Sequence, residues 1–342
     1  MMPNLLCDTA GMTREQWLDC RMHGPDGNIP YTLGGSDVAA VFGVSPWTTP
    51  LELWHIKKGL IQANDSANAV VKEMGHLMEP IVAQCYAKAT GNKIISDTGL
   101  YQHAEYPYAL ANLDYRVEEK GRQGVLECKS TTYHKAGDWA EGRIPYFYEL
   151  QVRYYLAVMD LDFADIACMW GFNPETDMAV CRICRDSAVE ALIFEKLDAF
   201  IESLELDIPP DMSNVQPDLA MAALARIYSA SKADLPTLEF GAPQADAIRR
   251  IALLQAEIKA LQEQQAQNEK EVTALSVPLA EIMKSHQHGV FEEPGLRFEV
   301  EYAPHVTRRP DSKALKADYP DVYAAVLKAT ESRKIKIKEV PA

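Results

Sequence analysis

An acid and a base two residues apart interrupt an apolar strand pattern in GVLECKSTT, residues 124–132. Residues i and i+2 of a strand share a face, so Glu127 and Lys129 should project together. Leu126 and Cys128 should then face the opposite layer. An isolated pair of this kind is most simply the salt-bridged face of an exposed edge strand. A second acid beside this pair would instead suggest a site that binds a cation.

Asp114 is the candidate for that second acid, because it interrupts the strand pattern YALANLDYRVE, residues 108–118. A carboxylate buried there must be paired or bound to a cation. On adjacent strands, Asp114 and Glu127 would repel each other unless they were protonated or bridged by a metal. Mg²⁺ suits such a pair, because it takes one or two protein carboxylates and keeps waters and substrate phosphates as its other ligands. Lys129 would hold an attacking water or stabilise negative charge at phosphorus.

The composition is that of an ordinary globular protein. Of the 342 residues, 47% are hydrophobic and 24% are charged. No stretch reaches the roughly 20 apolar residues that a membrane helix needs, and the N-terminus lacks the pattern of a secretion signal. Seven scattered cysteines therefore predict reduced thiols in a cytoplasm. The net charge of −15 argues against coating nucleic acid by charge alone, but it allows basic residues concentrated in one channel.

Cys181 and Cys184 have the C-x-x-C spacing of a metal or redox site. No second C-x-x-C is present to complete a zinc site, and the surrounding AVCRICRD alternates like a strand. The spacing therefore favours a strand over a metal site.

Hydrophobic periodicity predicts a mixed α/β domain over residues 1–208. Its expected helices and strands follow one another as a helix over 75–91, strands near 93–101, 108–118 and 124–131, a helix over 147–160, strands over 163–172 and 178–186, and a helix over 186–206. This order places the three charged residues on neighbouring strands, with helices before and after them.

The composition changes at residue 208, where a different kind of sequence begins. Residues 209–243 are rich in proline and predict a linker with one short helix, and residues 244–284 predict a coiled-coil helix. Residues 285–342 predict a small α+β module, with a helix over 311–328 and a basic strand over 332–340. The polar pair Gln265 and Asn268 should weaken the coiled-coil seam in its middle, and Pro278 should kink or restart the helix. The seam positions are three and four residues apart: Ala247, Ile251, Leu254, Ile258, Leu261, Gln265, Asn268, Val272, Leu275, Leu279 and Ile282.

The D-x₁₂-E-x-K spacing resembles the PD-(D/E)xK nuclease signature, although Leu113 stands where that signature has proline. Most of the chain resembles the YqaJ-type viral recombinase nucleases, which are relatives of phage lambda exonuclease. GGSDVAAVFGVSPWTTPLELW resembles the family's N-terminal block and follows a W-x₃-R formed by Trp17 and Arg21. GHLMEP supplies its G-x₃-E-P with Glu79, and LQVRYYLAV resembles its Q-x₂-Y helix with Gln151. The coiled-coil segment and the tail resemble its C-terminal extension.

The resemblance implies a restriction-endonuclease-like fold, in which a mixed sheet is flanked by helices. It implies that Asp114, Glu127 and the backbone carbonyl of Cys128 bind divalent metal, with Glu79 supporting a second ion. The expected cofactor is a pair of Mg²⁺ ions, for which Mn²⁺ would substitute.

The resemblance also implies roles for the polar residues around the metal. Lys129 and Gln151 would orient the attacking water, with Gln151 pointing toward the lysine. Arg21 and Ser36 would bind a 5′-phosphate, and Lys135 stands where the family often has a basic residue. An arginine fork and a hydroxyl near a helix N-terminus suit a terminal phosphate.

The implied activity is 5′→3′ exonuclease digestion of one strand of linear double-stranded DNA, in a bacterial or phage-infected cytoplasm and away from membranes. The 3′ overhang would pass to a single-strand annealing recombinase, and the enzyme would be a toroidal homotrimer. Three alternatives stay open. They are a RecB/Cas4-like nuclease with an iron–sulfur cluster, a non-catalytic DNA-end-binding protein on the same fold, and a scaffold built on the coiled coil.

Three of the candidate residues also have simpler structural interpretations. Glu79 beside Pro80 could cap the first turn of its helix. Gln151 could be a satisfied polar residue among apolar neighbours, and Arg21 could extend past Trp17 at the surface. Tertiary contacts distinguish these interpretations from the functional ones.

Overall fold

The computed structural model describes residues 2–63, 69–229, 235–307, 311–326 and 335–337. Two compact units divide the chain, Met1–Ser229 and Ala230–Ala342.

The first unit contains a five-stranded mixed sheet with strand order β2-β5-β6-β7-β8. The central strands β6 and β7 are parallel, and every other neighbouring pair is antiparallel. Parallel neighbours need a crossover connection, and the helix α5 supplies it between β6 and β7. The strands are β2 Lys93–Ser96, β5 Tyr115–Glu119, β6 Arg122–Ser130, β7 Phe163–Met169 and β8 Met178–Cys184.

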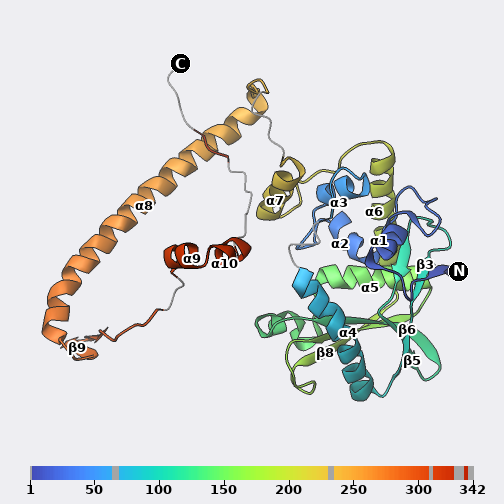
Figure 1. The fold of residues 1–342 in the computed structure, drawn as a ribbon, viewed down its shortest axis with the longest axis horizontal. Coiled ribbons are helices and arrows are strands. Elements are labelled where there is room, and N and C mark those ends of the chain that lie inside the picture. Colours follow the sequence, from blue (N-terminus) through green and yellow to red (C-terminus); the bar gives the residue numbers. More distant parts are fainter. Residues whose placement is uncertain (1, 64–68, 230–234, 308–310, 327–334, 338–342) are drawn as a thin grey trace. The chain divides into compact units, whose positions relative to one another are not determined.

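Helices cover both faces of this sheet (Figure 1). On one face, α4 (Ala69–Thr90) buries Val82 and Tyr86 against Leu126 of β6. On the other face, α5 (Tyr146–Met159) packs against Val125 and Ile166 and is backed by α2 (Gly35–Val41) and α6 (Ser187–Glu205). A mixed sheet flanked by helices confirms the predicted fold class.

The predicted strands 93–101 and 108–118 are each divided between two sheets. β3 (Gly99–Gln102) and β4 (Leu110–Asn112) join β1 (Asn4–Asp8) in a three-stranded sheet, whereas β2 and β5 belong to the larger one. Asp114 therefore lies in the bend between β4 and β5, and not inside a strand. Leu113, just before the bend, is buried, and Tyr115, just after it, begins β5.

The remaining elements of the first unit are short. They are α1 (Arg14–His23), which begins with a Thr13–Gln16 capping box, α3 (Pro50–Lys57), the 3₁₀ segment η1 (Tyr133–Gly142) and α7 (Pro217–Ile227). Arg226 of α7 forms an ion pair with the buried Glu52 of α3, and Ala223 is buried. The first unit therefore extends to Ser229, rather than ending at 208 before a linker over 209–243.

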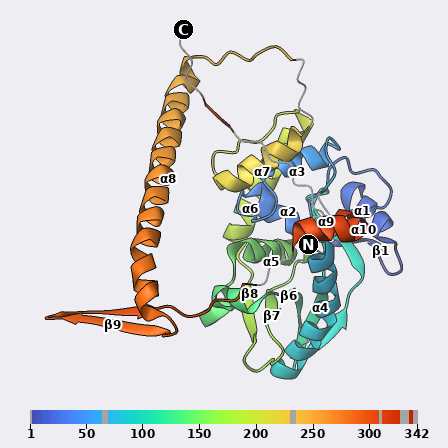
Figure 2. The ribbon, with the colours of Figure 1, turned by 60° about the vertical axis from the view of Figure 1, so that its left-hand side comes forward.

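The second unit begins with one long helix, α8 (Ala242–Met283), which runs on through Pro278 without the predicted restart. A two-stranded antiparallel hairpin follows at its end, formed by β9 (His288–Glu293) and β10 (Leu296–Glu301) (Figure 2). The predicted helix over 311–328 is instead two helices, α9 (Ser312–Asp318) and α10 (Pro320–Val326). The predicted basic strand over 332–340 falls largely outside the described residues. None of the helices in the described ranges has the length and apolarity to cross a membrane.

Candidate active site

Strand β6 presents Glu127 and Lys129 to the α5 side of the sheet, as the alternation predicts. Leu126 and Cys128 point the other way and are buried under α4. Glu127 keeps only 1% of its surface exposed, although it lies in a central strand paired with Ile166. An acid so deeply buried must have partners, because an isolated buried carboxylate is strongly disfavoured.

Asp114 is the nearest of those partners. Tyr115 pairs with Leu126, and continuing this antiparallel register places Asp114 opposite Glu127. The Cys128 backbone N–H donates to Asp114 Oδ2 at 2.8 Å, which fixes the bend against β6. Burial raises the pKa of Glu127 to about 7, the charge of Asp114 adds to the rise, and Lys129 opposes it. Burial also raises the pKa of Asp114. The two acids therefore disfavour each other's charged form.

Lys129 supplies the positive charge of the site. Its Nζ lies 2.5 Å from Glu127 Oε1 and 4.9 Å from the centroid of the Tyr148 ring. Burial would lower the pKa of the Lys129 ammonium, but the charges of Glu127 and Asp114 raise it above its usual value. The ammonium therefore stays protonated beside the acid pair.

Gln151 reaches the site from α5 and meets Lys129 at one atom, because both side chains donate to Glu127 Oε1. Its Nε2 donates to Glu127 Oε1 at 2.8 Å and to the Tyr155 hydroxyl at 3.2 Å. This hydrogen bond fixes the orientation of the Glu127 carboxylate. Because Oε1 is occupied, Oε2 is the oxygen that remains free to bind a cation. Tyr155 was missed in the sequence, although its i+4 spacing from Gln151 on a helix could have indicated the contact.

Glu79 lies close to the acid pair from the α4 side. Burial raises the pKa of Glu79, and the charge of Asp114 adds to the rise. His76 Nδ1 lies 2.8 Å from Glu79 Oε1 and holds the side chain. Because α4 begins at Ala69, Glu79 is not in a first turn, and the capping interpretation is wrong.

One oxygen of this site has no partner. Glu127 Oε2 is buried, and no described residue offers it a hydrogen bond. An unsatisfied buried acceptor costs about 1–3 kcal/mol, more for a charged group, and a cation would remove that cost. The acid pair and this free oxygen fit Mg²⁺, which needs only one or two protein carboxylates.

The predicted four-donor metal set is not assembled as such. Among the described residues, no three His, Cys, Asp or Glu side chains form a cluster that could hold a metal ion. Glu79, held by His76, stands beside Asp114 and Glu127 without completing a trio with them. The side-chain donors of the site are therefore the two acids on β6 and at its neighbouring bend.

A second polar group lies at the predicted phosphate site. Arg21 of α1 stacks over the Trp17 ring at 4.7 Å and donates from Nη2 to Ser36 Oγ at 3.2 Å. A Cβ at Gly34 would come within 2.4 Å of Arg21 Nη2, so any larger residue there would displace the guanidinium from this position. The Arg21 side chain is therefore held in place, rather than extending freely past Trp17.

Asp37 and Lys57 surround this arginine and were not predicted from the sequence. They form an ion pair at 2.9 Å with little exposed side-chain surface. Burial would raise the pKa of Asp37, but the charges of Lys57 and Arg21 lower it below its usual value. Arg21 therefore stands beside a permanent negative charge that balances it while no anion is bound.

Tyr155 joins the two polar groups. A Cβ at Gly35, which precedes Ser36, would lie 2.6 Å from the Tyr155 ring. Burial raises the pKa of Tyr155, and of its charged neighbours Glu127 adds to the rise while Arg21 opposes it. One buried ring therefore lies near both the acid pair and the arginine.

Lys135, the remaining candidate for the phosphate site, makes no hydrogen bond with Arg21 or Ser36. It is exposed on η1, and its side chain makes no hydrogen bond or ion pair with any residue in the described ranges. The structure gives no positional support for a role beside Arg21.

Comparisons with known proteins match this part of the chain. The profile described as YqaJ-like viral recombinase domain matches residues 16–162. Residues 16–162 are therefore similar to that domain. The protein YqaJ of Bacillus subtilis (strain 168) is 28% identical over 342 residues, spanning 98% of each chain. The predicted resemblance to this family is confirmed.

Two solved structures are also similar to the chain. The alkaline exonuclease LHK-Exo from Laribacter hongkongensis is 22% identical, and the match covers 57% of this chain and 94% of that one, with a TM-score of 0.46. A phage-related exonuclease from Haemophilus somnus 129PT is 14% identical, with coverage of 52% and 95% and a TM-score of 0.36.

The YqaJ-like domain contains every predicted site residue from Arg21 to Gln151, and it also contains Tyr155. Cys181 and Cys184 lie outside it, on β8, where Cys181 is buried and Cys184 is exposed. Alternation along the strand turns these two thiols to opposite faces, so they are not arranged to share a metal or a cluster. The strand interpretation of the C-x-x-C spacing is confirmed.

Proposed function

We propose that the chain is a Mg²⁺-dependent 5′→3′ exonuclease that degrades one strand of linear double-stranded DNA. The observation that carries the proposal is the buried group of Asp114, Glu127 and Lys129, in which Glu127 Oε2 has no partner among the described residues. Two adjacent acids with raised pKa values and an unsatisfied oxygen suit a site that functions with a cation bound.

The side chains divide the chemistry between them. Asp114 and Glu127 would hold the ion, which when bound neutralises phosphate charge and lowers the pKa of a bound water. Lys129, kept protonated by the acids, would stabilise negative charge developing on the phosphate. Gln151 would fix Glu127 through Oε1 and so keep Oε2 directed to the ion.

Arg21 and Ser36 would bind the terminal 5′-phosphate of the strand being degraded. A guanidinium and a hydroxyl together match the acceptors of a phosphate, and Asp37 and Lys57 hold the arginine in place. Tyr155 would keep this group at a fixed position relative to Glu127, because its ring packs against Gly35 and its hydroxyl meets Gln151. Recognition of a strand end would thus be coupled to cleavage beside it.

The product of this reaction is a duplex with a 3′ overhang. Such an overhang is the substrate of a single-strand annealing recombinase, and similarity to a viral recombinase domain family supports a partner of that class. The homotrimer expected from the resemblance remains part of this proposal.

The decisive assay is digestion of linear duplexes labelled at either end, with and without a 5′-phosphate. The expected result is Mg²⁺-dependent loss of the 5′ label first, and slower digestion of ends that lack the phosphate. Lys129→Ala should reduce the rate by at least about 100-fold, because it removes the charge at the reacting phosphate. Lys93→Ala, at an exposed lysine of the same sheet, is the matched control and should keep full activity.

Two outcomes would contradict the proposal. Undiminished digestion by the Lys129→Ala variant would exclude the assigned role of that lysine. Tight binding of duplex ends with no digestion under any divalent metal would instead favour the non-catalytic end-binding protein.

A further inference from the structure

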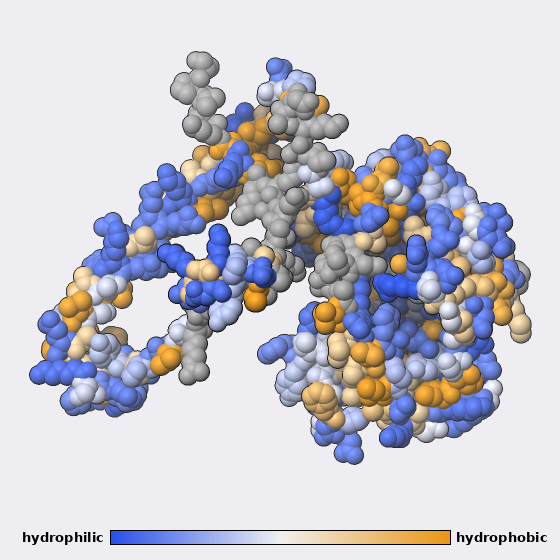
Figure 3. Space-filling view, in the orientation of Figure 1, coloured by the Kyte–Doolittle hydropathy of each residue, from blue (hydrophilic) through white to orange (hydrophobic). Residues whose placement is uncertain are grey.

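Helix α8 carries a long apolar stripe that the described residues leave largely exposed. Its 42 residues correspond to a rod of roughly 63 Å. Leu261, Val272 and Leu275 keep 59%, 63% and 63% of their surface exposed. Apolar side chains gather toward both ends of the helix, with hydrophilic ones between them (Figure 3). We call the heptad a and d positions between Ala247 and Ile282 the α8 seam.

The a and d positions of the α8 seam differ in residue type. The a positions outside its middle include β-branched Ile251, Ile258 and Val272, and the d positions that follow them hold leucine, as at Leu254 and Leu275. β-branched residues at a with leucine at d favour a parallel coiled coil of two strands. The order is reversed only in the last layers, with Leu279 at a and Ile282 at d, so the preference for two strands comes from the layers between Ile251 and Leu275.

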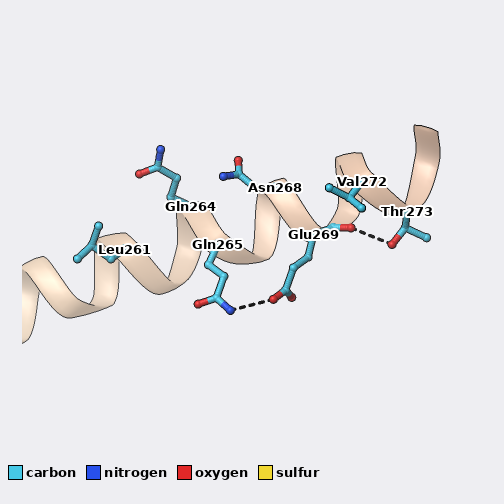
Figure 4. Close-up of a pocket in the computed structure, with 7 residues that line it drawn as sticks. All are labelled: Leu261, Gln264, Gln265, Asn268, Glu269, Val272 and Thr273. Carbon is cyan, nitrogen blue, oxygen red and sulfur yellow. Dashed lines mark hydrogen bonds between the residues drawn. The ribbon is translucent and has the colours of Figure 1, made fainter. Parts of the chain in front are cut away.

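The middle of the α8 seam is polar, with Gln265 at an a position and Asn268 at a d position. An open hollow lies here on the helix surface, lined by these two residues and by Leu261 and Val272, among others of α8 (Figure 4). Polar residues at seam positions weaken a coiled coil but fix its register, because any shift would place them against apolar layers.

We propose that the α8 seam pairs with the α8 seam of a second copy of this chain, in a parallel, in-register, two-stranded coiled coil. In that alignment each polar layer meets its own counterpart, and each apolar layer meets an apolar layer. The flanking positions are compatible as well. Glu257 of one copy faces Gln262 of the other, and Glu271 faces Ser276, so these pairs bring no like charges together.

Apart from the half-buried Ile251, the described residues of the second unit leave this face exposed. The described tail contacts α8 where Gln255 Nε2 donates to Ile335 O at 3.1 Å and Gln255 Oε1 accepts from Ile337 N at 3.3 Å. Gln255 is at an e position, beside the seam and not within it. At the other end, Met283 is buried near Gly289 of the hairpin, just beyond the last seam position. The pairing involves the second unit alone and does not depend on the proposed nuclease activity. Alongside the proposed homotrimer, each coiled coil would join a copy in one trimer to a copy in another.

Two substitutions of the same kind on α8 test the pairing. Val272→Asp places a charge in the seam, whereas Val277→Asp places it at an f position, on an exposed valine facing away from the partner. The particle mass of the full-length chain is measured by sedimentation or light scattering. We expect the Val272→Asp particle to have half the mass of the Val277→Asp particle or less. Equal masses for the two variants would overturn the proposal.

A cross-link tests the direction of the two helices. The native cysteines all lie in the first unit, so Leu254→Cys adds the single thiol of α8. Mild oxidation of the full-length variant should join position 254 of one copy to position 254 of the other, as peptide mass spectrometry would show. In an antiparallel pair centred on the polar residues, Leu254 would lie opposite Leu279. Absence of the 254–254 link would therefore overturn the parallel arrangement.

Discussion

Replacing Glu127 with glutamine tests whether the buried acid pair is destabilising without a cation. The folded chain raises the pKa of Glu127 from 4.5 to about 7, mainly through burial and the charge of Asp114. A carboxyl with a raised pKa binds its proton more tightly when folded, so the free energy of unfolding falls as pH rises through this window. The difference between 4.5 and about 7 corresponds to about 3 kcal/mol at most.

Glutamine keeps the shape of the side chain and its contact with Gln151, but it carries no titrating group. In the presence of a chelator, we expect Glu127→Gln to be more stable than the wild type by up to about 3 kcal/mol above pH 7. Below about pH 4.5 the two proteins should be nearly equal, because Glu127 is then neutral in both folded and unfolded chains.

Urea denaturation followed by tryptophan fluorescence measures this difference. All five tryptophans lie in the unit Met1–Ser229, so the signal reports the unit that contains the site. Glu118→Gln, on the neighbouring strand β5 and partly exposed, is the matched control, and its effect should stay below about 1 kcal/mol at either pH.

Mg²⁺ provides the second half of the test. A ligand that binds only the folded state adds about 2.7 kcal/mol at 100 times its Kd, and this gain should appear in the wild type and be lost in Glu127→Gln. The reasoning is refuted if Glu127→Gln is less stable than the wild type at about pH 8 in chelator, since the buried charge would then be stabilising.

Two further predictions concern the residues proposed to bind the 5′-phosphate and the glycine beside them. Arg21→Ala should abolish the preference for ends with a 5′-phosphate, whereas Lys135→Ala should preserve it, as measured by the ratio of digestion rates for phosphorylated and unphosphorylated duplexes; a loss in both variants would restore Lys135 to the site. Gly35→Ala should lower the free energy of unfolding by about 1–3 kcal/mol, because its Cβ would meet the Tyr155 ring at 2.6 Å. Gly137→Ala, where a Cβ meets nothing within 4 Å, should be neutral, and equal denaturation midpoints for both variants would contradict the steric argument.

The sequence by itself determined the features that depend on local periodicity. The two-residue period of a strand placed Glu127 and Lys129 on one face and Cys128 on the other, as the structure confirms. The same alternation identified Cys181 and Cys184 as strand residues. Heptad spacing predicted the helix that became α8, because a regular helix repeats its face at a fixed interval.

The tertiary structure decided whatever depends on contacts between distant segments. The bend at Asp114 follows from the chain passing between two sheets, which strand propensity does not encode. Gln151 turns to Glu127 because α5 crosses that face of β6, and Tyr155 packs against Gly35 because α2 lies behind α5. Likewise α7, which composition assigned to a linker, belongs to the first unit through the ion pair of Arg226 with Glu52. Each of these contacts joins residues that are far apart in the sequence. They form only when helices and sheets pack together, so no local sequence pattern predicts them.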